Sequence, residues 1–169
     1  GFLRDYYQKQ SSIDLHYLNV MLTDLAYDGQ WKPFFESIAL AYRENSSVRD
    51  AMEGERNLQG FLKAYLALAS YYLVEPELEM NYGYCDFFLL PDKKRYPDIG
   101  HSYILELKYA GRTTTDTELE TQAEEGRRQL LQYSKDKIAL QLAQDTTLHL
   151  ILLQFRGWDL VKCEEIASC

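Results

Sequence analysis

The sequence has few of the features that mark specialised classes of protein. Only three of its 169 residues are cysteine and four are proline, which excludes a disulfide-rich scaffold and a proline-rich linker. Its longest apolar runs, such as Leu148–Phe155, are far shorter than the ~20 residues that span a bilayer. Positive charge is scarce, because 18 Lys and Arg face 26 Asp and Glu and give a net charge of -8. The sequence therefore predicts no membrane partner and no broad basic surface that would hold a polyanion.

The few cysteines also indicate a compartment. Cys85, Cys163 and Cys169 show neither a CxxC motif nor the Cys/His spacing of a zinc site. Reduced thiols are typical of a cytoplasmic protein, which is the location we expect. The chain begins with Gly1 rather than Met, and we expect it to continue upstream in a longer protein.

What the sequence does contain is an even spread of apolar residues, 46% of the total, as in an ordinary globular domain. Helical spacing of these residues predicts helices at about 13–28, 33–44 and 51–72. Ser11 and Ser12 are candidate caps of the first helix, and Gly29 is its expected end. The polar stretch Asn45–Asp50 is the one candidate boundary. It divides a helical lead at 1–50, packed on the core, from an α/β domain at 51–169.

From Leu73 onward the apolar period changes from helical to two, which indicates strands. Three strands are expected near 73–80, 82–90 and 102–109. A long helix then begins at Asp116, its predicted cap, and runs to about Leu142. Two further strands, near 147–155 and 158–166, meet at a turn. This order predicts an α/β fold in which N-terminal helices precede a β-β-β-α-β-β unit.

Ionisable residues interrupt the two middle strands. Asp86 lies beside a run of Phe and Leu, while Glu106 and Lys108 share one face of the next strand. A hairpin folded about Tyr96 places Asp86 opposite Glu106, with Cβ atoms within about 5.5 Å. Two carboxylates this close repel each other unless a cation lies between them. A divalent ion would satisfy both and activate water, and Lys108 would orient that water or stabilise developing charge. The alternative is that both carboxylates face solvent and that Glu106 merely pairs with Lys108.

These residues, in this order of elements, resemble the PD-(D/E)XK nuclease superfamily, which has a restriction-endonuclease-like αβββαβ core. Asp86 and the tripeptide Glu106–Lys108 match its motif. The helix that follows carries QLLQY at Gln129–Tyr133, which resembles the Q-x-x-x-Y signature of RecB-type nucleases. The segment Glu55–Leu62 and the strand ending at Asp86 are similar to a nuclease-like domain found after an AAA-ATPase-like domain in bacterial proteins of unknown function. That resemblance covers about 51–155 and implies an ATPase-like domain upstream of this chain.

The resemblance also implies roles for individual residues. Lys108 matches the catalytic lysine of the superfamily. Mg²⁺ or Mn²⁺ is expected at the metal site, whose residues would be Asp86, Glu106, Glu55 and the backbone carbonyl of Leu107. Contacts to DNA are expected from Gln129, Tyr133, Tyr84 and Arg128. The chain departs from its relatives in two ways, because Tyr84 stands where they commonly carry Arg and no histidine occupies the upstream metal-ligand position of some RecB-type enzymes.

The sequence therefore predicts a metal-dependent nuclease that hydrolyses DNA phosphodiester bonds. The alternative is a catalytically inactive nuclease-fold module that binds nucleic acid or a partner. The basic clusters at 93–95 and 127–128 lie near the expected site, and each is as well explained by phosphate binding as by a solvated surface. Since much of the acid excess lies at 75–79 and 118–125, it can face away from DNA. We expect weak, salt-sensitive DNA binding by this chain alone.

Overall fold

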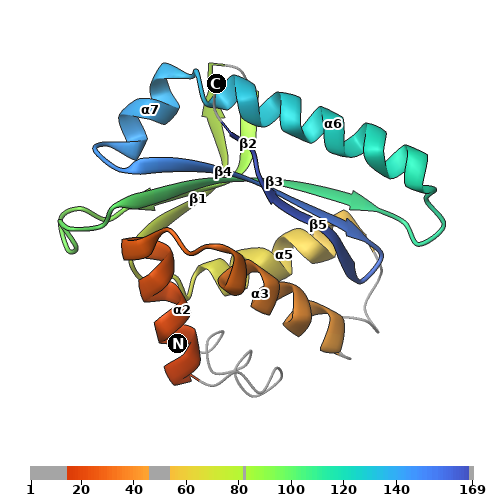
Figure 1. The fold of residues 1–169 in the computed structure, drawn as a ribbon, viewed down its shortest axis with the longest axis horizontal. Coiled ribbons are helices and arrows are strands. Elements are labelled where there is room, and N and C mark those ends of the chain that lie inside the picture. The colour runs from red at the N-terminus through yellow and green to blue at the C-terminus, as the bar shows by residue number, and fades with distance from the viewer. Residues whose placement is uncertain (1–14, 46–53, 82, 168–169) are drawn as a thin grey trace.

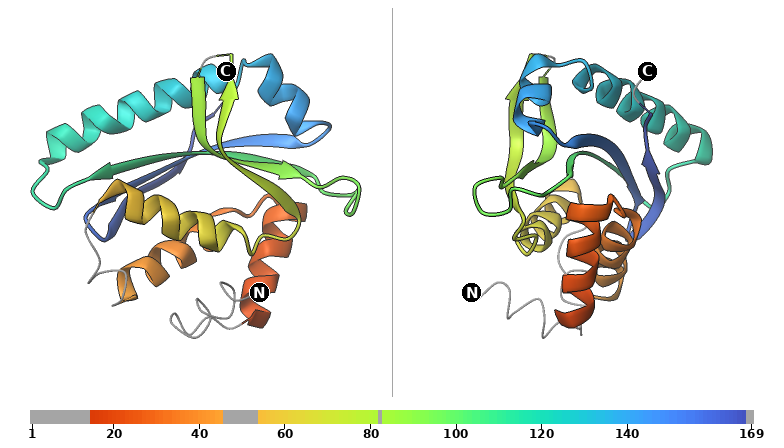
Figure 2. Two further views of the ribbon diagram at one scale, coloured as in Figure 1. Left: turned by 180° about the vertical axis from the view of Figure 1, so that it is seen from behind. Right: turned by 60° about the vertical axis from the view of Figure 1, so that its left-hand side comes forward.

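One five-stranded mixed sheet forms the centre of the computed structural model, which describes residues 15–45, 54–81 and 83–167 (Figure 1). In spatial order the strands are β1 (Tyr72–Met80), β2 (Gly83–Pro91), β3 (His101–Ala110), β4 (Thr147–Arg156) and β5 (Asp159–Glu165). One face of the sheet carries the helices α2 (Leu15–Thr23), α3 (Lys32–Glu44) and α5 (Glu55–Leu66) (Figure 2). The other face carries α6 (Asp116–Tyr133) and α7 (Lys137–Ala143). This architecture confirms the predicted α/β, restriction-endonuclease-like fold.

The strand directions follow from the connections. Short connections join β1 to β2, β2 to β3 and β4 to β5, and these pairs are antiparallel. The crossover through α6 and α7 makes β4 parallel to β3. In the β2–β3 pair, Phe87 lies opposite Leu105 and Leu89 lies opposite Tyr103. This is the register predicted by folding the hairpin about Tyr96, and one further step brings Asp86 level with Glu106.

The N-terminal helices pack their apolar faces on the sheet in one core cluster, which includes Leu25, Phe35 and Tyr103. Helix α2 continues into a π-helical turn, η1 (Asp24–Asp28), which ends at Gly29 as predicted. Gly29 has a φ of 70°, and a Cβ there would lie 2.7 Å from the ring of His101, so this turn requires glycine. No helix in the described part of the chain has an apolar stretch long enough to cross a membrane.

Two predicted helix boundaries are wrong. The third helix ends at Leu66 rather than near Tyr72, because Leu68 and Ala69 turn the chain by bonding to carbonyls three residues back. The long helix predicted to reach Leu142 is two helices. Asp136 separates them, because its side chain accepts hydrogen bonds from the first backbone N–H groups of α7.

The cap of α6 also differs from the prediction. Thr115, not Asp116, is the N-cap residue, and its hydroxyl accepts a hydrogen bond from the backbone N–H of Glu118 at 3.2 Å. The Glu118 carboxylate accepts one in return from the backbone N–H of Thr115 at 3.3 Å. This reciprocal capping box places the helix start one residue earlier than a cap at Asp116 would.

Candidate functional site

Strands β2 and β3 part at the candidate site, and the side chain of Asp86 fills the fork between them. Backbone pairing runs from Leu89–Tyr103 to Phe87–Leu105. At the next step, Asp86 Oδ2 accepts a hydrogen bond from the backbone N–H of Leu107 at 2.7 Å. The carboxylate therefore takes the place of a sheet hydrogen bond, which fixes its position relative to Glu106 and Lys108 on β3.

Glu106 is buried at this fork with an incomplete set of partners. Glu106 is only 5% exposed, and its oxygen Oε1 lies 3.6 Å from Lys108 Nζ. The other oxygen, Oε2, has no hydrogen-bond partner within the described part of the chain. Burial and the nearby charge of Asp86 raise the pKa of Glu106 to about 8, and Lys108 offsets this only in part. Burial likewise raises the pKa of Asp86. Paired carboxyls with raised pKa values are typical of functional sites.

This donor set fits a hard divalent cation. Mg²⁺ and Mn²⁺ take oxygen ligands, and Mg²⁺ commonly uses one or two protein carboxylates together with water and substrate phosphate. Asp86 and Glu106 offer two carboxylates, and the unpartnered Oε2 of Glu106 is a buried oxygen in need of a positive partner. Among the described residues, no three His, Cys, Asp or Glu side chains converge in a way that could hold a metal ion. The arrangement therefore suits an ion with few protein ligands rather than a closed zinc site.

The remaining predicted metal-site residues are less closely tied to the fork. Glu55 is exposed at the start of α5, and its charge contributes to the raised pKa of Asp86. It is therefore within electrostatic range of the fork, and its role as a ligand stays a prediction. The backbone of Leu107 contacts Asp86 through its N–H. Its carbonyl as a ligand is likewise a prediction.

Helix α6 holds Lys108 in place through a close approach at Gly126. A Cβ built on Gly126 would lie 2.8 Å from Leu152 Cδ1 and 3.4 Å from Lys108 Cε. The absence of a side chain lets α6 lie directly on β3 and β4, where it packs along the alkyl chain of Lys108. The Lys108 side chain is consequently 17% exposed, with its ammonium group beside Glu106.

Substituting Gly126 with alanine should destabilise the fold by about 1–3 kcal/mol, because the added methyl overpacks this contact. Gly60, in the middle of α5, is the matched control, since a Cβ there would meet nothing within 4 Å. Gly60→Ala should instead stabilise the protein by about 0.5–1 kcal/mol, as in any open helix position. Urea unfolding of both variants measures the difference. Equal effects of the two substitutions would show that α6 does not depend on Gly126 for its approach.

Of the predicted nucleic-acid residues of α6, Tyr133 lies within electrostatic range of the same fork. Gln129 and Tyr133 are four residues apart and share a helix face. Tyr133 is 2% exposed, and the charges of Glu106 and Asp86 add to the burial that raises its pKa. The side-chain oxygen of Gln129 is buried, with no hydrogen-bond partner in the part of the chain described. Arg128 is exposed on α6, whereas the side chain of Tyr84 lies outside the described residues.

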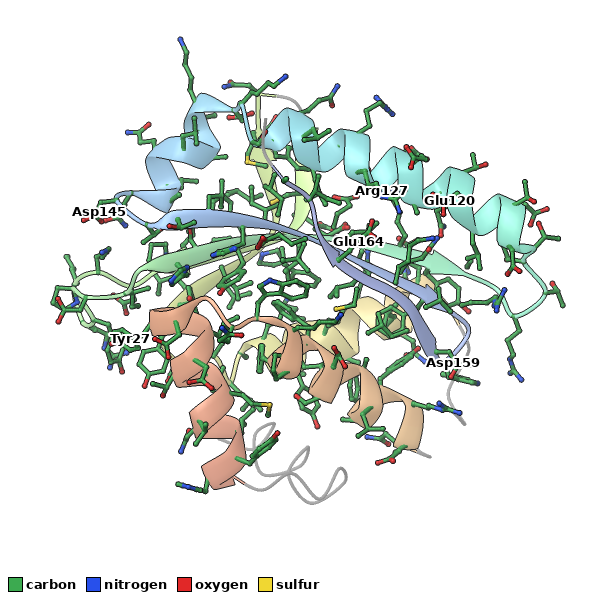
Figure 3. All side chains as sticks on the ribbon, viewed as in Figure 1. Tyr27, Glu120, Arg127, Asp145, Asp159 and Glu164 are labelled. Carbon is green, nitrogen blue, oxygen red and sulfur yellow. The ribbon has the colours of Figure 1, made fainter. Side chains whose placement is uncertain are left out.

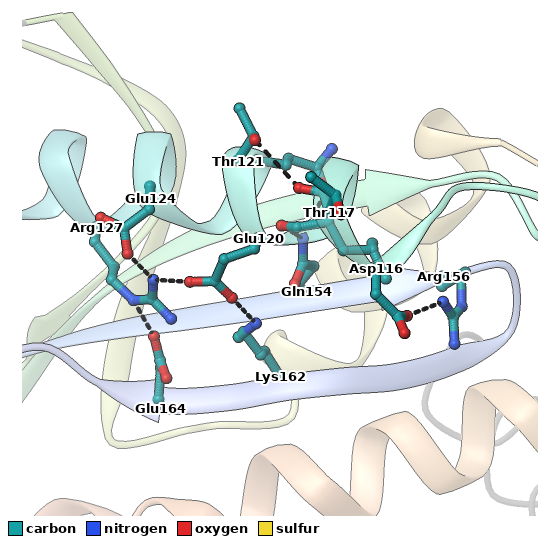
Figure 4. Close-up of polar contacts among 12 residues, drawn as sticks. Asp116, Thr117, Glu120, Thr121, Glu124, Arg127, Gln154, Arg156, Lys162 and Glu164 are labelled. Carbon is teal, nitrogen blue, oxygen red and sulfur yellow. Dashed lines mark hydrogen bonds and ion pairs between the residues drawn. The ribbon is translucent and has the colours of Figure 1, made fainter.

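Two residues of the basic clusters that the sequence places near the site instead hold the fold together, and one of them, Lys93, lies on the β2–β3 loop away from the fork. Arg127 binds Glu120 and Glu124 of its own helix and Glu164 of β5, so three carboxylates surround it (Figure 4). These residues gather between α6 and β5 (Figure 3). Lys93 is bound by Asp145 at 3.0 Å and donates hydrogen bonds to two backbone carbonyls of its own loop. Neither cation is free to bind phosphate, so the interpretation of 93–95 and 127–128 as phosphate sites is wrong for these two residues.

The structure adds basic residues that the sequence analysis did not single out. A pocket of about 270 Å³ opens beside Asp86, between α5 and the β1–β2 hairpin. Arg56 and Lys63 of α5 line it, together with Glu77 of β1. Glu77 adopts a φ of 50° and adds to the raised pKa of Asp86. The spacing of Arg56 and Lys63 on one helix face was the available signal, but the pocket depends on where the hairpin lies.

Comparison with known proteins identifies a family. The family model described as PD-(D/E)XK nuclease superfamily matches residues 53–165, more than half of the chain. The match includes α5, the whole sheet and α6. Searches of curated proteins and of solved structures gave no significant match.

Proposed function

Because the chain belongs to the PD-(D/E)XK nuclease superfamily, we propose that it is a metal-dependent nuclease that hydrolyses phosphodiester bonds in DNA. The observation that carries the proposal is the buried, unpartnered oxygen of Glu106 beside Asp86. A buried carboxylate that Lys108 compensates only in part is costly, and a cation is the partner that would offset the rest of the cost. The superfamily is typically metal-dependent, and this donor set suits Mg²⁺ or Mn²⁺.

Each residue at the fork would have a separate role in the proposed reaction. Asp86 and Glu106 would hold the ion, which would polarise a phosphoryl oxygen and lower the pKa of a bound water. The backbone N–H of Leu107 fixes the orientation of the Asp86 carboxylate by its hydrogen bond to Oδ2. The other carboxylate oxygen, Oδ1, therefore also has a fixed orientation. The ammonium group of Lys108, held by Glu106 and by the packing of α6, would orient the attacking water and stabilise negative charge.

Helix α6 would position the strand. The buried oxygen of Gln129, which has no partner among the described residues, would accept a hydrogen bond from the substrate, and the amide nitrogen of the same side chain would donate one to a phosphate or base. Tyr133, whose pKa the charge of Glu106 helps to raise, would close the site on that side. Exposed Arg128 would contact the DNA backbone next to Gln129. We propose Tyr84 as a further contact and Glu55 and the Leu107 carbonyl as further metal-site groups.

The broader organisation is also proposed. The D…ELK…QxxxY order supports a RecB-like enzyme. The similarity of Glu55–Leu62 to nuclease-like domains that follow an AAA-ATPase-like domain supports such a domain as a partner of this one. We propose the division into a helical lead at 1–50 and a nuclease domain at 51–169, working in the cytoplasm.

Calorimetric titration with Mn²⁺ tests the metal site directly. We expect the wild type to bind the ion and Asp86→Asn to weaken the affinity at least about tenfold, because the substitution removes one charged ligand. Asp98→Asn is the matched control, since Asp98 is exposed on the β2–β3 loop, away from the fork. It should bind Mn²⁺ as the wild type does. Equal binding by all three proteins, or none by the wild type, would favour the inactive nuclease-fold module.

A further inference from the structure

The pocket between α5 and the β1–β2 hairpin, called the α5 pocket below, has the candidate metal ligand Asp86 in its lining. Its volume is about 270 Å³. Helix α5 forms one wall and the strands form the other, and the lining residues are Arg56, Gln59, Gly60, Lys63, Pro76, Glu77, Asp86 and Phe87. The pocket thus joins the fork from the side of the sheet opposite to α6.

Two cations of α5 face this pocket. Arg56 and Lys63 are seven residues apart, which is two helical turns or about 10 Å along the axis. Both are exposed, and neither forms an ion pair with another residue in the described ranges. Arg127 and Lys93 differ in this respect, since carboxylates hold both of them. The charges of Arg56 and Lys63 are therefore available to a ligand.

Gly60 gives a second reason to regard the pocket as a binding site. It lies in the middle of α5, where glycine is less favourable than alanine. Its φ lies outside the left-handed region, and a Cβ there would touch nothing within 4 Å. Neither the backbone nor the packing of the protein requires glycine at this position. The missing side chain leaves the helix wall of the pocket open.

The charges of the lining residues depend on the metal site. Arg56 and Lys63 supply two positive charges, and Glu77 and Asp86 supply two negative charges, so the lining is neutral overall. A divalent cation held by Asp86 would leave the pocket positive. An anion should therefore enter only after the cation has bound. The size is also restrictive, because about 270 Å³ lies at the lower limit of typical ligand pockets and suits one nucleotide unit rather than a duplex.

We propose that the α5 pocket binds a backbone phosphate of single-stranded nucleic acid, next to the phosphodiester held at Asp86, through Arg56 and Lys63. This inference rests on the proposed function and names its substrate class. The strand would run from the Gln129 side of α6, across the fork, into the α5 pocket. Gln59, between the two cations, would contact the sugar or base of the bound nucleotide.

Binding of a fluorescent oligothymidine to the whole chain tests this inference. Ca²⁺ replaces Mg²⁺ as the divalent cation, and EDTA provides the metal-free state. We expect Arg56→Gln/Lys63→Gln to weaken binding about tenfold at low salt. The slope of log affinity against log salt should fall by about 0.7, because the two substitutions together remove one phosphate contact. In EDTA the wild type and the double variant should bind equally weakly.

A matched double variant separates the pocket from overall charge. Lys94→Gln/Arg95→Gln removes the same two charges from the exposed β2–β3 loop, at the opposite end of the strands. It should leave the affinity and the salt slope unchanged. Equal losses in the two double variants, or no loss in Arg56→Gln/Lys63→Gln, would overturn the inference.

Filling the pocket provides an independent test. Gly60→Leu places a side chain in the open wall of the α5 pocket and favours the helix, so its melting temperature should not fall. Gly60→Leu should weaken binding of the oligothymidine at least about fivefold.

The form of the nucleic acid is tested with the wild type. A blunt duplex of the same length should bind more weakly than the single strand does, and tighter binding of the duplex would contradict the inference. If the wild type cleaves DNA in a metal-dependent way but the variants bind the oligothymidine as the wild type does, only the proposal about the α5 pocket is refuted. If the wild type does not bind Mn²⁺, the proposed function itself is refuted.

Discussion

Lys108→Met is expected to reduce metal-dependent DNA cleavage by about 10²–10⁴-fold, the usual contribution of a group that acts on the attacking water. Methionine retains the unbranched chain that packs against Gly126, and it removes only the ammonium group. The loss should therefore appear in kcat, with the fold intact. Cleavage of a labelled oligonucleotide in Mn²⁺, compared with the same reaction in EDTA, measures it.

The effect of Lys108 on catalysis must be separated from its effect on Glu106. Lys108 lowers the pKa of Glu106, so its removal raises that pKa and weakens metal binding near neutral pH. At pH 9 or above this indirect effect shrinks, because more of the Glu106 carboxylate is ionised. A cleavage defect that persists at high pH, with Mn²⁺ binding retained, identifies a direct role of the ammonium group.

Lys162→Met is the matched control for this substitution. Lys162 is also a lysine on the α6 side of the sheet, on β5, but it pairs with Glu120 of α6 rather than with the fork (Figure 4). Its replacement should leave cleavage within about twofold, because exposed ion pairs contribute little. If Lys108→Met and Lys162→Met cut DNA equally fast, Lys108 has no part in the reaction.

The register of the central hairpin could be predicted because it depends on local features. The apolar period of two defines each strand, and the polar loop around Tyr96 defines the fold point. Together they place Asp86 level with Glu106. The hydrogen bond from the backbone of Leu107 to Asp86 could not be predicted, since it requires the strands to part at that residue. Pattern alone does not show where a pair of strands ends.

Arg127 and Arg128 show where the sequence left two interpretations of a basic cluster open. The two residues are adjacent and chemically identical, so the sequence offers no reason to separate them. Only the position of β5 decides between them, because Glu164 of β5 binds Arg127 while Arg128 remains exposed. The cations of α5 were overlooked for a related reason. Their pocket is formed jointly with the β1–β2 hairpin, which is a tertiary contact.

Some of the helix boundaries could be predicted from the sequence. Asp136 follows Ser134 and Lys135 and precedes an apolar stretch, which is a helix-start signal in the interior of the predicted long helix. Continuous helical spacing outweighed that signal, although Asp136 begins α7 in the structure. The end of α5 at Leu66 had no comparable signal, because apolar residues continue through Ala69. Packing of the following turn on the core decides that boundary.

Glu106→Gln is expected to stabilise the metal-free protein at pH 9 by about 2–4 kcal/mol. The pKa of Glu106 is about 8 in the folded protein, whereas an unfolded chain has a glutamate pKa of about 4.3. Between these two values the folded state alone holds the proton. The free energy of unfolding of the wild type should therefore fall as the pH rises, by up to about 1.4 kcal/mol per unit. The stabilisation that comes from the protonated Glu106 side chain is complete below about pH 4 and is lost as the pH rises through about 8.

Glutamine keeps the shape of Glu106 and cannot ionise, so the variant should lose most of this pH dependence. Urea unfolding in EDTA from pH 5 to 9 measures it, and Glu79→Gln, at an exposed position of β1, is the control that should retain the wild-type slope. A Glu106→Gln variant less stable than the wild type at pH 9 would show that the carboxylate has a stabilising partner. Mn²⁺ at pH 9 should raise the stability of the wild type and not that of the variant. Ionised Glu106 thus destabilises the metal-free protein, and a bound cation would relieve this destabilisation. Glu106→Gln, which stabilises the metal-free protein, should therefore also abolish cleavage.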